Sequence, residues 1–461
     1  MAEVPHFDRR MSDAEGLMWR LEKDPFLSST FTTLTVLDRP VDMDRYRRRM
    51  ERAVALIPRL RQRVHPSPVS LTPPTWVDDD EFELDRHVRH IVLPAPGSLR
   101  QLYDLAARYG SDPLDRTRPL WEFLVVDGLD DGRAALLQKM HHTIVDGEAG
   151  VKLSMQFLDL ERDAPDPPPL TDDELPPPEP APTPGSFDGM RDLLAGGLRM
   201  PLGMARQVTS LLAEPLSIPS AGRAAVAGIK GVVTQLADVE RAHSPLWTER
   251  SLRRHLEVLT APFDDTKRAA KALGGTLNTA FVTAAAHAGG AYHRQLGAPV
   301  EVLRTSMAIS TRSSGSGSNA FSLARIDVPT GDMPIAERFQ RIHEASQAAR
   351  SAGRGSMATL AAVATTLPTS LITRLARVQT QTVDFATSNV KAAPFPLYVA
   401  GARIEHNYPV GPLGGVAFNL TLLSYDGRLD MGLHCDPAAV AEPDRLRRLM
   451  VEAFAELAAS V

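Results

Sequence analysis

Two adjacent histidines, His141 and His142, are the side chains best suited to chemistry in this sequence, and Asp146 and Gly147 follow them closely. An imidazole has an unperturbed pKa of about 6.5, so it can accept a hydroxyl proton near neutral pH and return it to a leaving group. The same four residues could instead form a hydrogen-bonded core feature before a turn, with Asp146 as the turn former. The residue types alone leave general-base catalysis and a structural role open.

The elements expected around the histidines are a strand, a loop and a helix. Residues 120–126 and 134–142 are apolar, strand-like runs, and residues 127–133 between them are rich in turn formers. A β-hairpin with a longer loop is the simplest arrangement. Beyond the histidines, apolar side chains recur at helical spacing at Val151, Met155 and Leu158. The histidine pair is therefore expected where a strand ends and the chain turns into a helix.

Strand alternation separates the two imidazoles. It puts His142 on the face of Met140 and His141 on the face of Lys139, so only one histidine can face a given cavity. This argues against a metal ion bound by both rings, and the sequence has no HExxH helix that would supply a zinc site. We expect no metal and no bound cofactor.

Length and composition indicate a two-domain globular protein. The chain has 461 residues, of which 43% are hydrophobic and 23% charged, and this length exceeds what one core usually supports, so two lobes of roughly 200 residues are expected. A formal net charge of -5 gives no reason to expect a nucleic-acid partner. Cys435 is the only cysteine, which excludes an intrachain disulfide and fits a reducing compartment.

Targeting signals are not evident. Charged residues interrupt the first 20 positions, which leaves no apolar core for a secretory signal, and no run of about 18 apolar residues occurs that could span a membrane. We expect a cytoplasmic protein whose membrane contact is peripheral at most, at the inner face of the membrane or on lipid inclusions.

Composition divides the chain into four parts. Residues 1–163 form an amino-terminal lobe, and residues 164–185 form a proline-rich linker whose composition favours extended, solvated chain. Residues 186–245 are rich in Gly, Ala and Leu and predict a connector of short helices, which would lie on a lipid surface or pack between the lobes. Residues 246–461 form a second lobe that mixes helices, such as 276–296, with strands, such as 302–309 and 416–424.

An arginine-rich helix is expected in the first lobe. Asp42 can cap it, its apolar positions recur at helical spacing from Tyr46 to Leu60, and Pro58 should end or kink it. The polar face carries Arg45, Arg47, Arg48, Arg49 and Arg52. We favour a solvated face, and the alternative is contact with lipid headgroups or CoA phosphates. A final amphipathic helix carrying Leu446, Met450, Phe454 and Leu457 is expected to cover a sheet.

Several segments carry a family resemblance. Residues 141–147 resemble the HHxxxDG motif of CoA-dependent acyltransferases, a motif that peptide condensation domains and polyketide-associated acyltransferases share. Residues 11–22, 119–122, 396–402 and 419–427 resemble, in matching order, the bacterial wax ester synthase/diacylglycerol acyltransferase family. The resemblance covers nearly the whole chain, and the combined set of segments is specific to that family.

The resemblance implies an α/β (α+β) fold of two chloramphenicol-acetyltransferase-like lobes, each a mixed sheet flanked by helices, with a channel between them. His142 would be the general base, His141 would organise the backbone, and Asp146, next to Gly147, would hold the loop through an ion pair. Arg312 is the candidate partner of Asp146. The substrates would be a fatty acyl-CoA and either diacylglycerol or a long-chain alcohol, and the product triacylglycerol or a wax ester.

Second-lobe residues would complete the site. Asn419, Thr421 and Ser424 lie on the strand-like segment that resembles the acceptor side of the family site, where they could stabilise the oxyanion or serve as ordinary ladder residues. Asn278 occupies a second-lobe motif, but Thr279 follows it where the family has Asp. Residues 391–393 are likewise Lys-Ala-Ala, where the family has a Pro-Gly-Pro turn.

These two departures leave two alternatives beside the expected reaction. One is acyl transfer to a different hydroxyl or amine. The other is a catalytically weak homologue that binds lipid or a lipid surface.

Overall fold

The computed structural model describes residues 7–66, 73–145, 147–167, 169–171, 175, 241–310, 321–352 and 369–461. Asp146, Arg312, most of the proline-rich linker and the connector expected over 186–245, apart from its last five residues, lie outside these ranges. Within the described residues, no helix is long and apolar enough to cross a membrane.

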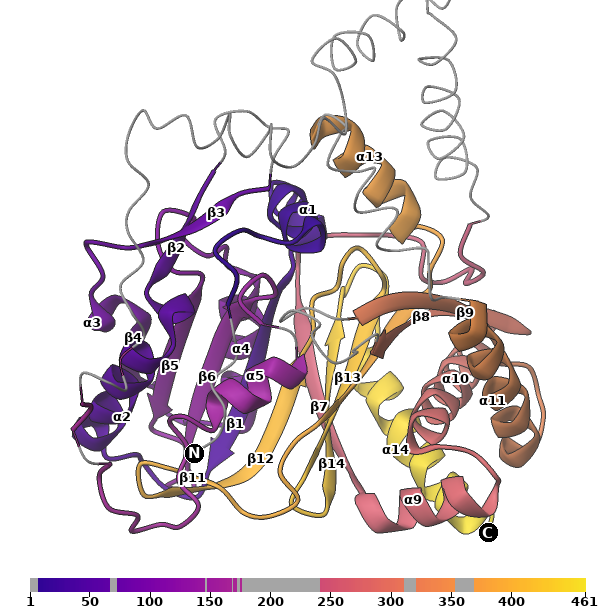
Figure 1. Cartoon of the computed structure of the whole chain (residues 1–461). Coiled ribbons are helices and arrows are strands. Elements are labelled where there is room, and N and C mark those ends of the chain that lie inside the picture. Colours follow the sequence, from indigo (N-terminus) through magenta and orange to yellow (C-terminus); the bar gives the residue numbers. More distant parts are fainter. Residues whose placement is uncertain are drawn as a thin grey trace, which may run out of the picture.

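Two six-stranded sheets stand side by side (Figure 1). The first has the order β11-β12-β1-β6-β5-β4 and the second the order β7-β14-β13-β10-β8-β9. The first comprises β1 (Thr30–Leu37), β4 (Val88–Val92), β5 (Trp121–Asp127), β6 (Ala134–His141), β11 (Tyr398–Val399) and β12 (Ala402–Val410). The second comprises β7 (His255–Pro262), β8 (Val302–Ser310), β9 (Phe321–Pro329), β10 (Phe385–Lys391), β13 (Phe418–Tyr425) and β14 (Arg428–Cys435). A small pair, β2 (Gln62–His65) and β3 (Thr75–Asp78), completes the strands of the described residues.

Helices cover both sheets. The first half holds α1 (Asp13–Leu21), α2 (Met43–Leu56), α3 (Leu84–His87), α4 (Leu99–Ser111) and α5 (Gly147–Ser154), with 3-10 turns η1 (Pro25–Leu27) and η2 (Pro58–Leu60). The second half holds α9 (Phe263–Ala272), α10 (Leu277–Gln295), α11 (Ile335–Ala352), α13 (Thr369–Thr380) and α14 (Pro443–Ala459). This mixed α/β architecture is the expected fold class.

Alternating side chains give the first sheet two cores. Met140 of β6 packs in one core with residues of α2 and α5, whereas Leu137 packs in another core with residues of α4. In the second lobe, α10 and α14 supply Phe281 and Met450 to the core that holds Leu420 of β13. The apolar face of α14 therefore covers the second sheet, as expected.

Local sequence signals match several observed elements. β5 and β6 pair as the expected antiparallel hairpin. Asp42 caps α2 by accepting the Arg45 amide at 2.9 Å, and the helix ends before Pro58. Thr276 caps α10 in the same way.

Strand β12 crosses between the lobes, which the sequence-based division did not foresee. It comes from the second half of the chain but pairs antiparallel with β1, from Thr32↔Val410 to Leu37↔Ile404, and appears in orange beside the indigo β1 in Figure 1. The expected assignment of residues 246–461 to one lobe is therefore corrected, since β11 and β12 complete the first sheet.

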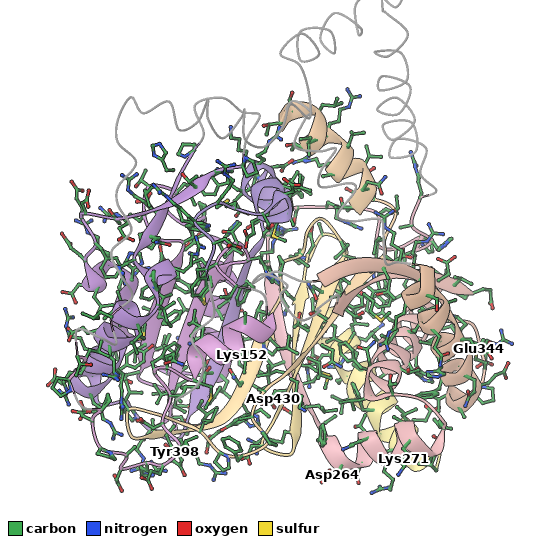
Figure 2. All side chains as sticks on the ribbon, viewed as in Figure 1. Lys152, Asp264, Lys271, Glu344, Tyr398 and Asp430 are labelled. Atoms are coloured by element: carbon green, nitrogen blue, oxygen red, sulfur yellow. The ribbon has the colours of Figure 1, made fainter. Side chains whose placement is uncertain are left out.

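The crossing brings the two sheets into close contact. A Cβ at Gly432 of β14 would lie 2.1 Å from the Pro409 carbonyl oxygen, so only glycine fits there. Asp430 of β14 accepts the Asn407 amide at 2.8 Å and lies 3.1 Å from His406 Nδ1, and Figure 2 labels it between the two sheets. Backbone and side-chain contacts therefore join the lobes along β12.

Candidate active site

His142 follows directly after β6, where the strand gives way to the loop before α5. Its backbone N–H donates to the Ser29 carbonyl at 3.1 Å, and its ring lies 4.7 Å from the Phe31 ring at a 42° tilt. The residue is partly buried. Its main chain is held from the segment before β1, and the residue as a whole keeps some exposure to solvent although its Nδ1 is buried.

His141 points into the protein and has only 1% of its surface exposed. Its Nδ1 accepts the Thr143 amide at 3.1 Å and lies 2.7 Å from the Thr143 hydroxyl. Its Nε2 lies 3.1 Å from Glu22 Oε2. Both ring nitrogens are thus engaged in the protein, a geometry that suits a residue that organises backbone and not one that exchanges protons with a substrate.

Glu22 is the partner of His141 that sequence reasoning missed. Its carboxylate also accepts the Ser29 amide at 2.7 Å, the Ser28 hydroxyl at 2.6 Å and the Thr30 hydroxyl at 3.4 Å. Burial alone would raise the pKa of Glu22, but the bonds from His141, Ser28 and Ser29 bring it below the ordinary glutamate value. The only signal in the sequence was its position at the end of the family-like segment 11–22.

The loop after His142 is described only in part. Gly147 opens α5, as the change to helical spacing predicted. Asp146 and Arg312 both lie outside the described residues, so their ion pair stays a prediction.

Asn419 and Thr421 of β13 support the loop that connects β12 to β13. The Asn419 amide donates to the Pro412 carbonyl at 2.7 Å, and the Thr421 hydroxyl donates to Asn419 Oδ1 at 3.0 Å. Both residues are buried, and none of their described contacts reaches the histidines. Ser424 is partly buried, and its carbonyl accepts the Ala392 amide at 3.0 Å. A role for the three in stabilising the oxyanion stays a prediction.

The departure at Thr279 is accommodated by its surroundings. Thr279 is 2% exposed, and its hydroxyl lies 3.0 Å from Thr276 Oγ1 and 3.1 Å from His343 Nδ1. The preceding Asn278 donates to Met307 Sδ at 3.0 Å and accepts the Asn389 amide at 3.4 Å. The hydroxyl therefore has hydrogen-bond partners in the site that the family fills with a carboxylate.

Residues 391–393 form part of the contact between the lobes. Lys391 ends β10 opposite Ser424 of β13, and Ala392 and Ala393 pack against the first-lobe core. β10 also contacts α5, the helix that follows the histidine loop. Asn278 accepts a hydrogen bond from Asn389 of β10. Through β10 it is connected to α5, the helix after the histidine pair.

The arginine-rich face of α2 binds protein and is not simply solvated. Arg45 and Arg49 are largely buried and contact the Asp159 carboxylate at 2.8 and 2.7 Å. They also donate to backbone carbonyls at residues 162, 164 and 165. The expectation of a solvated face is therefore wrong for these two arginines, because a later segment of the chain covers them.

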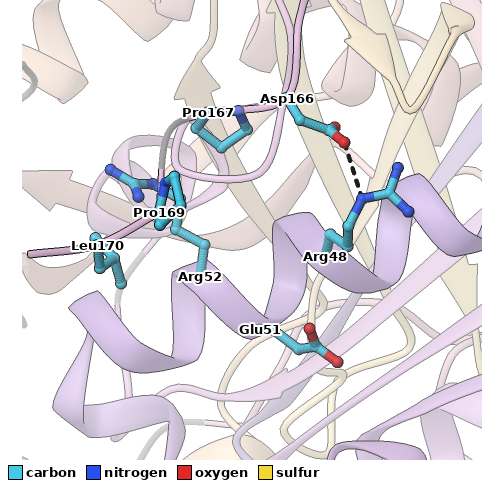
Figure 3. A pocket seen from close by; sticks show the side chains of 7 residues that line it. All are labelled: Arg48, Glu51, Arg52, Asp166, Pro167, Pro169 and Leu170. Carbon is cyan, nitrogen blue, oxygen red and sulfur yellow. Dashed lines mark hydrogen bonds and ion pairs between the residues drawn. The ribbon is translucent and has the colours of Figure 1, made fainter.

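A shallow hollow of about 290 Å³ lies where the linker meets α2 (Figure 3). The dashed line in Figure 3 marks the ion pair between Arg48 and Asp166, whose Nε and Oδ2 atoms lie 2.8 Å apart. The lining residues are Arg48, Glu51, Arg52, Asp166, Pro167, Pro169 and Leu170. Neither histidine of the motif lines this hollow, so it is separate from the candidate active site.

Among the described residues, no group of three or more His, Cys, Asp or Glu side chains is arranged to hold a metal ion. The polar groups gathered at the end of β6 are suited to proton transfer and to backbone support.

Comparisons with known proteins agree on one family. Residues 11–281 match the model of the wax ester synthase/diacylglycerol acyltransferase catalytic domain, and residues 317–458 match that of the WS/DGAT C-terminal domain. A putative diacylglycerol O-acyltransferase of Mycobacterium tuberculosis is 33% identical over 470 residues, covering 99% of this chain and 93% of that protein.

Solved structures show the same fold. The wax ester synthase/diacylglycerol acyltransferase from Marinobacter aquaeolei VT8 has a TM-score of 0.66 at 21% identity and covers 97% of this chain and 98% of its own. The trichothecene 15-O-acetyltransferase from Fusarium sporotrichioides has a TM-score of 0.59 at 10% identity, with 99% of both chains covered.

Two sheet-based lobes, with a histidine pair at the end of a first-lobe strand, form the two-lobe, chloramphenicol-acetyltransferase-like fold. The chain belongs to the wax ester synthase/diacylglycerol acyltransferase family and is an acyl-CoA-dependent O-acyltransferase.

Proposed function

We propose that the protein transfers a long-chain fatty acyl group from acyl-CoA to diacylglycerol or a long-chain alcohol, with His142 as the general base. The observation that carries this assignment is the contrast between the two histidines. Both ring nitrogens of the buried His141 are engaged with Thr143 and Glu22, whereas His142 is the partly exposed member of the pair. The products would be triacylglycerol or a wax ester.

The proposed reaction needs one base and no covalent acyl-enzyme. His142 takes the hydroxyl proton of the acceptor as its oxygen attacks the thioester carbonyl. The resulting oxyanion, stabilised by hydrogen-bond donors, collapses and breaks the carbon–sulfur bond. The departing CoA thiolate then recovers the proton from the His142 imidazolium. Asp146, paired with Arg312, would keep the loop in place during these steps.

The relatives support the choice of acceptors. The Mycobacterium tuberculosis protein carries the name diacylglycerol O-acyltransferase, and the Marinobacter protein that of wax ester synthase as well. A different hydroxyl or amine acceptor, or a catalytically weak lipid-binding protein, are the competing possibilities. Thr279 is buried with hydrogen-bond partners, so its replacement of the family carboxylate leaves no unpaired polar group at that position.

A thiol assay for CoA release tests the proposal. Purified protein is given palmitoyl-CoA with either hexadecanol or dioleoylglycerol, and products are separated by thin-layer chromatography. His142→Ala should slow CoA release by about 100- to 10,000-fold, the usual cost of losing a general base. His65→Ala, which removes an exposed histidine at the end of β2, is the matched control and should turn over like the wild type.

Each result has a definite meaning. If His142→Ala releases CoA as fast as the wild type, His142 is not the base. If the wild type turns over only with other acceptors on the plates, the acceptor assignment is wrong. If it binds lipid without turnover, the lipid-binding alternative replaces this proposal.

We also propose that the enzyme meets its substrates as a peripheral protein on the inner face of the membrane or on lipid inclusions. Long-chain acceptors reside in lipid, so the site must be supplied from a lipid surface. Co-flotation of the full chain with vesicles that contain dioleoylglycerol is expected, and recovery only in the vesicle-free fraction would contradict it.

A further inference from the structure

We propose that Glu22 is a positioning residue for acyl transfer, which holds His141 in one tautomer and thereby fixes the backbone that presents His142. This inference rests on the proposed role of His142 as the base. Glu22 itself would touch no substrate. It would act through the two protein segments that meet at the end of β6.

The contacts of His141 determine its tautomer. The Thr143 backbone N–H can only donate, and it points at Nδ1 from 3.1 Å, so Nδ1 must be the unprotonated nitrogen. The hydrogen of a neutral His141 therefore lies on Nε2, which faces Glu22 Oε2 at 3.1 Å. Glu22 is thus the acceptor that stabilises this tautomer from the other side of the ring, and the ring so held accepts the Thr143 amide just beyond His142.

Glu22 also supports the facing strand. Its Oε2 accepts the Ser29 amide at 2.7 Å, and the Ser29 carbonyl accepts the His142 amide at 3.1 Å. Its Oε1 faces the hydroxyls of Ser28 and Thr30. One carboxylate is thereby linked to the His142 main chain by two routes, through the adjacent His141 and through Ser29.

The charge of Glu22 suits this arrangement. The side chain is only 11% exposed, and every described group around it can donate a hydrogen bond, which a carboxylate accepts without a conflicting donor of its own. Arg116 interacts with Glu22 through charge, and its guanidinium lies 3.5 Å from the centre of the Trp19 ring. Glu22 is therefore held by the hydrogen-bond donors of Ser28, Ser29 and His141, and its described ion pairs include no arginine.

Loss of these bonds should affect catalysis more than binding. A displacement of about 1 Å in a catalytic group can cost about 100-fold in rate, whereas Glu22 itself would touch neither substrate. Glu22→Ala should lower kcat by about 10- to 100-fold with little change in KM. Glu22→Gln should recover kcat to within a few-fold, because its oxygen can serve His141 and Ser29 while its amide donates to the hydroxyls of Ser28 and Thr30.

The experiment compares Glu22→Ala, Glu22→Gln, His141→Ala and the double variant Glu22→Ala/His141→Ala in the CoA-release assay. If Glu22 acts through His141, the double variant should be about as slow as the slower single variant, and not slower by the product of both effects. Thermal midpoints identify any variant that fails to fold, and His141→Ala then tests the same link alone. Wild-type kcat in Glu22→Ala or in His141→Ala would overturn the inference, as would equal losses in Glu22→Ala and Glu22→Gln.

A second readout does not depend on turnover. In protein labelled with ¹⁵N-histidine, the His141 resonances, assigned by their loss in His141→Ala, should report a hydrogen on Nε2 in the wild type and in Glu22→Gln. A hydrogen on Nδ1 in the wild type would overturn the inference, as would an Nε2 resonance of His141 that is the same in Glu22→Ala as in the wild type, because Nε2 loses its carboxylate acceptor in that variant. If His142→Ala stays active, the proposed base fails, but this spectrum still decides whether Glu22 controls His141.

Discussion

Asp24 accepts a hydrogen bond of 2.8 Å from Nη2 of Arg377, which joins two residues 353 positions apart. Arg377 lies on α13, which packs against α1 and η1, and its guanidinium also lies 4.4 Å from the Phe26 ring. Asp24 comes two residues after Glu22. The ion pair therefore attaches a second-half helix to the segment that supports the histidine loop.

Arg377→Ala should destabilise the protein by about 1 kcal/mol at pH 7, as expected for a partly exposed ion pair. Arg377 is the main cause of the lowered pKa of Asp24, so the contribution is present above the ordinary aspartate value of about 3.9 and is lost as the pH falls through the lower folded value. Urea unfolding at pH 7 and in acid measures the difference. Arg374→Ala, an exposed arginine one turn earlier, is the control, and an equal effect of both substitutions would contradict this role.

His434 should make stability depend on pH in the acid range. The ring is 7% exposed, its Nδ1 donates to the Gly411 carbonyl at 2.8 Å, and burial lowers its pKa to about 4. The unfolded chain binds this proton near pH 6.5, so the contribution is complete above that value and declines as the pH falls towards 4. Each pH unit in this window is worth about 1.4 kcal/mol, which amounts to about 3 kcal/mol.

The variant His434→Asn, whose amide can reach the same carbonyl, should show a flatter profile of unfolding free energy between about pH 6.5 and 4. His65→Asn alters an exposed ring and should keep the wild-type profile. Identical slopes for wild type and His434→Asn would show that His434 does not titrate with folding.

Gly432→Ala should disturb the crossing of β12 over the second sheet. The added methyl would lie 2.1 Å from the Pro409 carbonyl oxygen, so the strands must separate, at a cost of about 1–3 kcal/mol. Gly16→Ala in α1 is the matched control, since its Cβ would make only an ordinary contact at 3.5 Å with Pro73 and alanine favours a helix. The thermal midpoint should fall for Gly432→Ala and not for Gly16→Ala. A midpoint for Gly432→Ala at or above the wild-type value would refute the close approach.

Asp159→Asn should loosen the segment that covers α2. Removing the charge leaves Arg45 and Arg49 without their carboxylate in a largely buried place, a change that costs about 3 kcal/mol or more. Trypsin should then cut faster after Arg162. Asp166→Asn, which breaks the exposed pair with Arg48, should be cut like the wild type. Equal resistance of both variants would mean that Asp159 does not secure this segment.

Local pattern in the sequence predicts much of this protein. The β5–β6 hairpin, the cap at Asp42 and the apolar stripe of α14 depend on residues a few positions apart, and each is found in the structure. The histidine motif and the family-like segments also identify the reaction class, because catalytic residue types cluster in a short stretch. His142 as the base is a prediction from that stretch.

The tertiary structure alone decides the contacts between distant segments. β12 joins the first sheet, Asp159 neutralises two arginines of α2 more than a hundred positions away, and Glu22 meets His141 across 119 positions. Strand pairing and buried ion pairs over such separations leave no period in the sequence, since each partner is chosen by the packing of the whole fold. The sequence by itself determined which imidazoles are present and where the strand ends, and only the packed structure decided that His141 is held by Glu22 while His142 stays partly exposed.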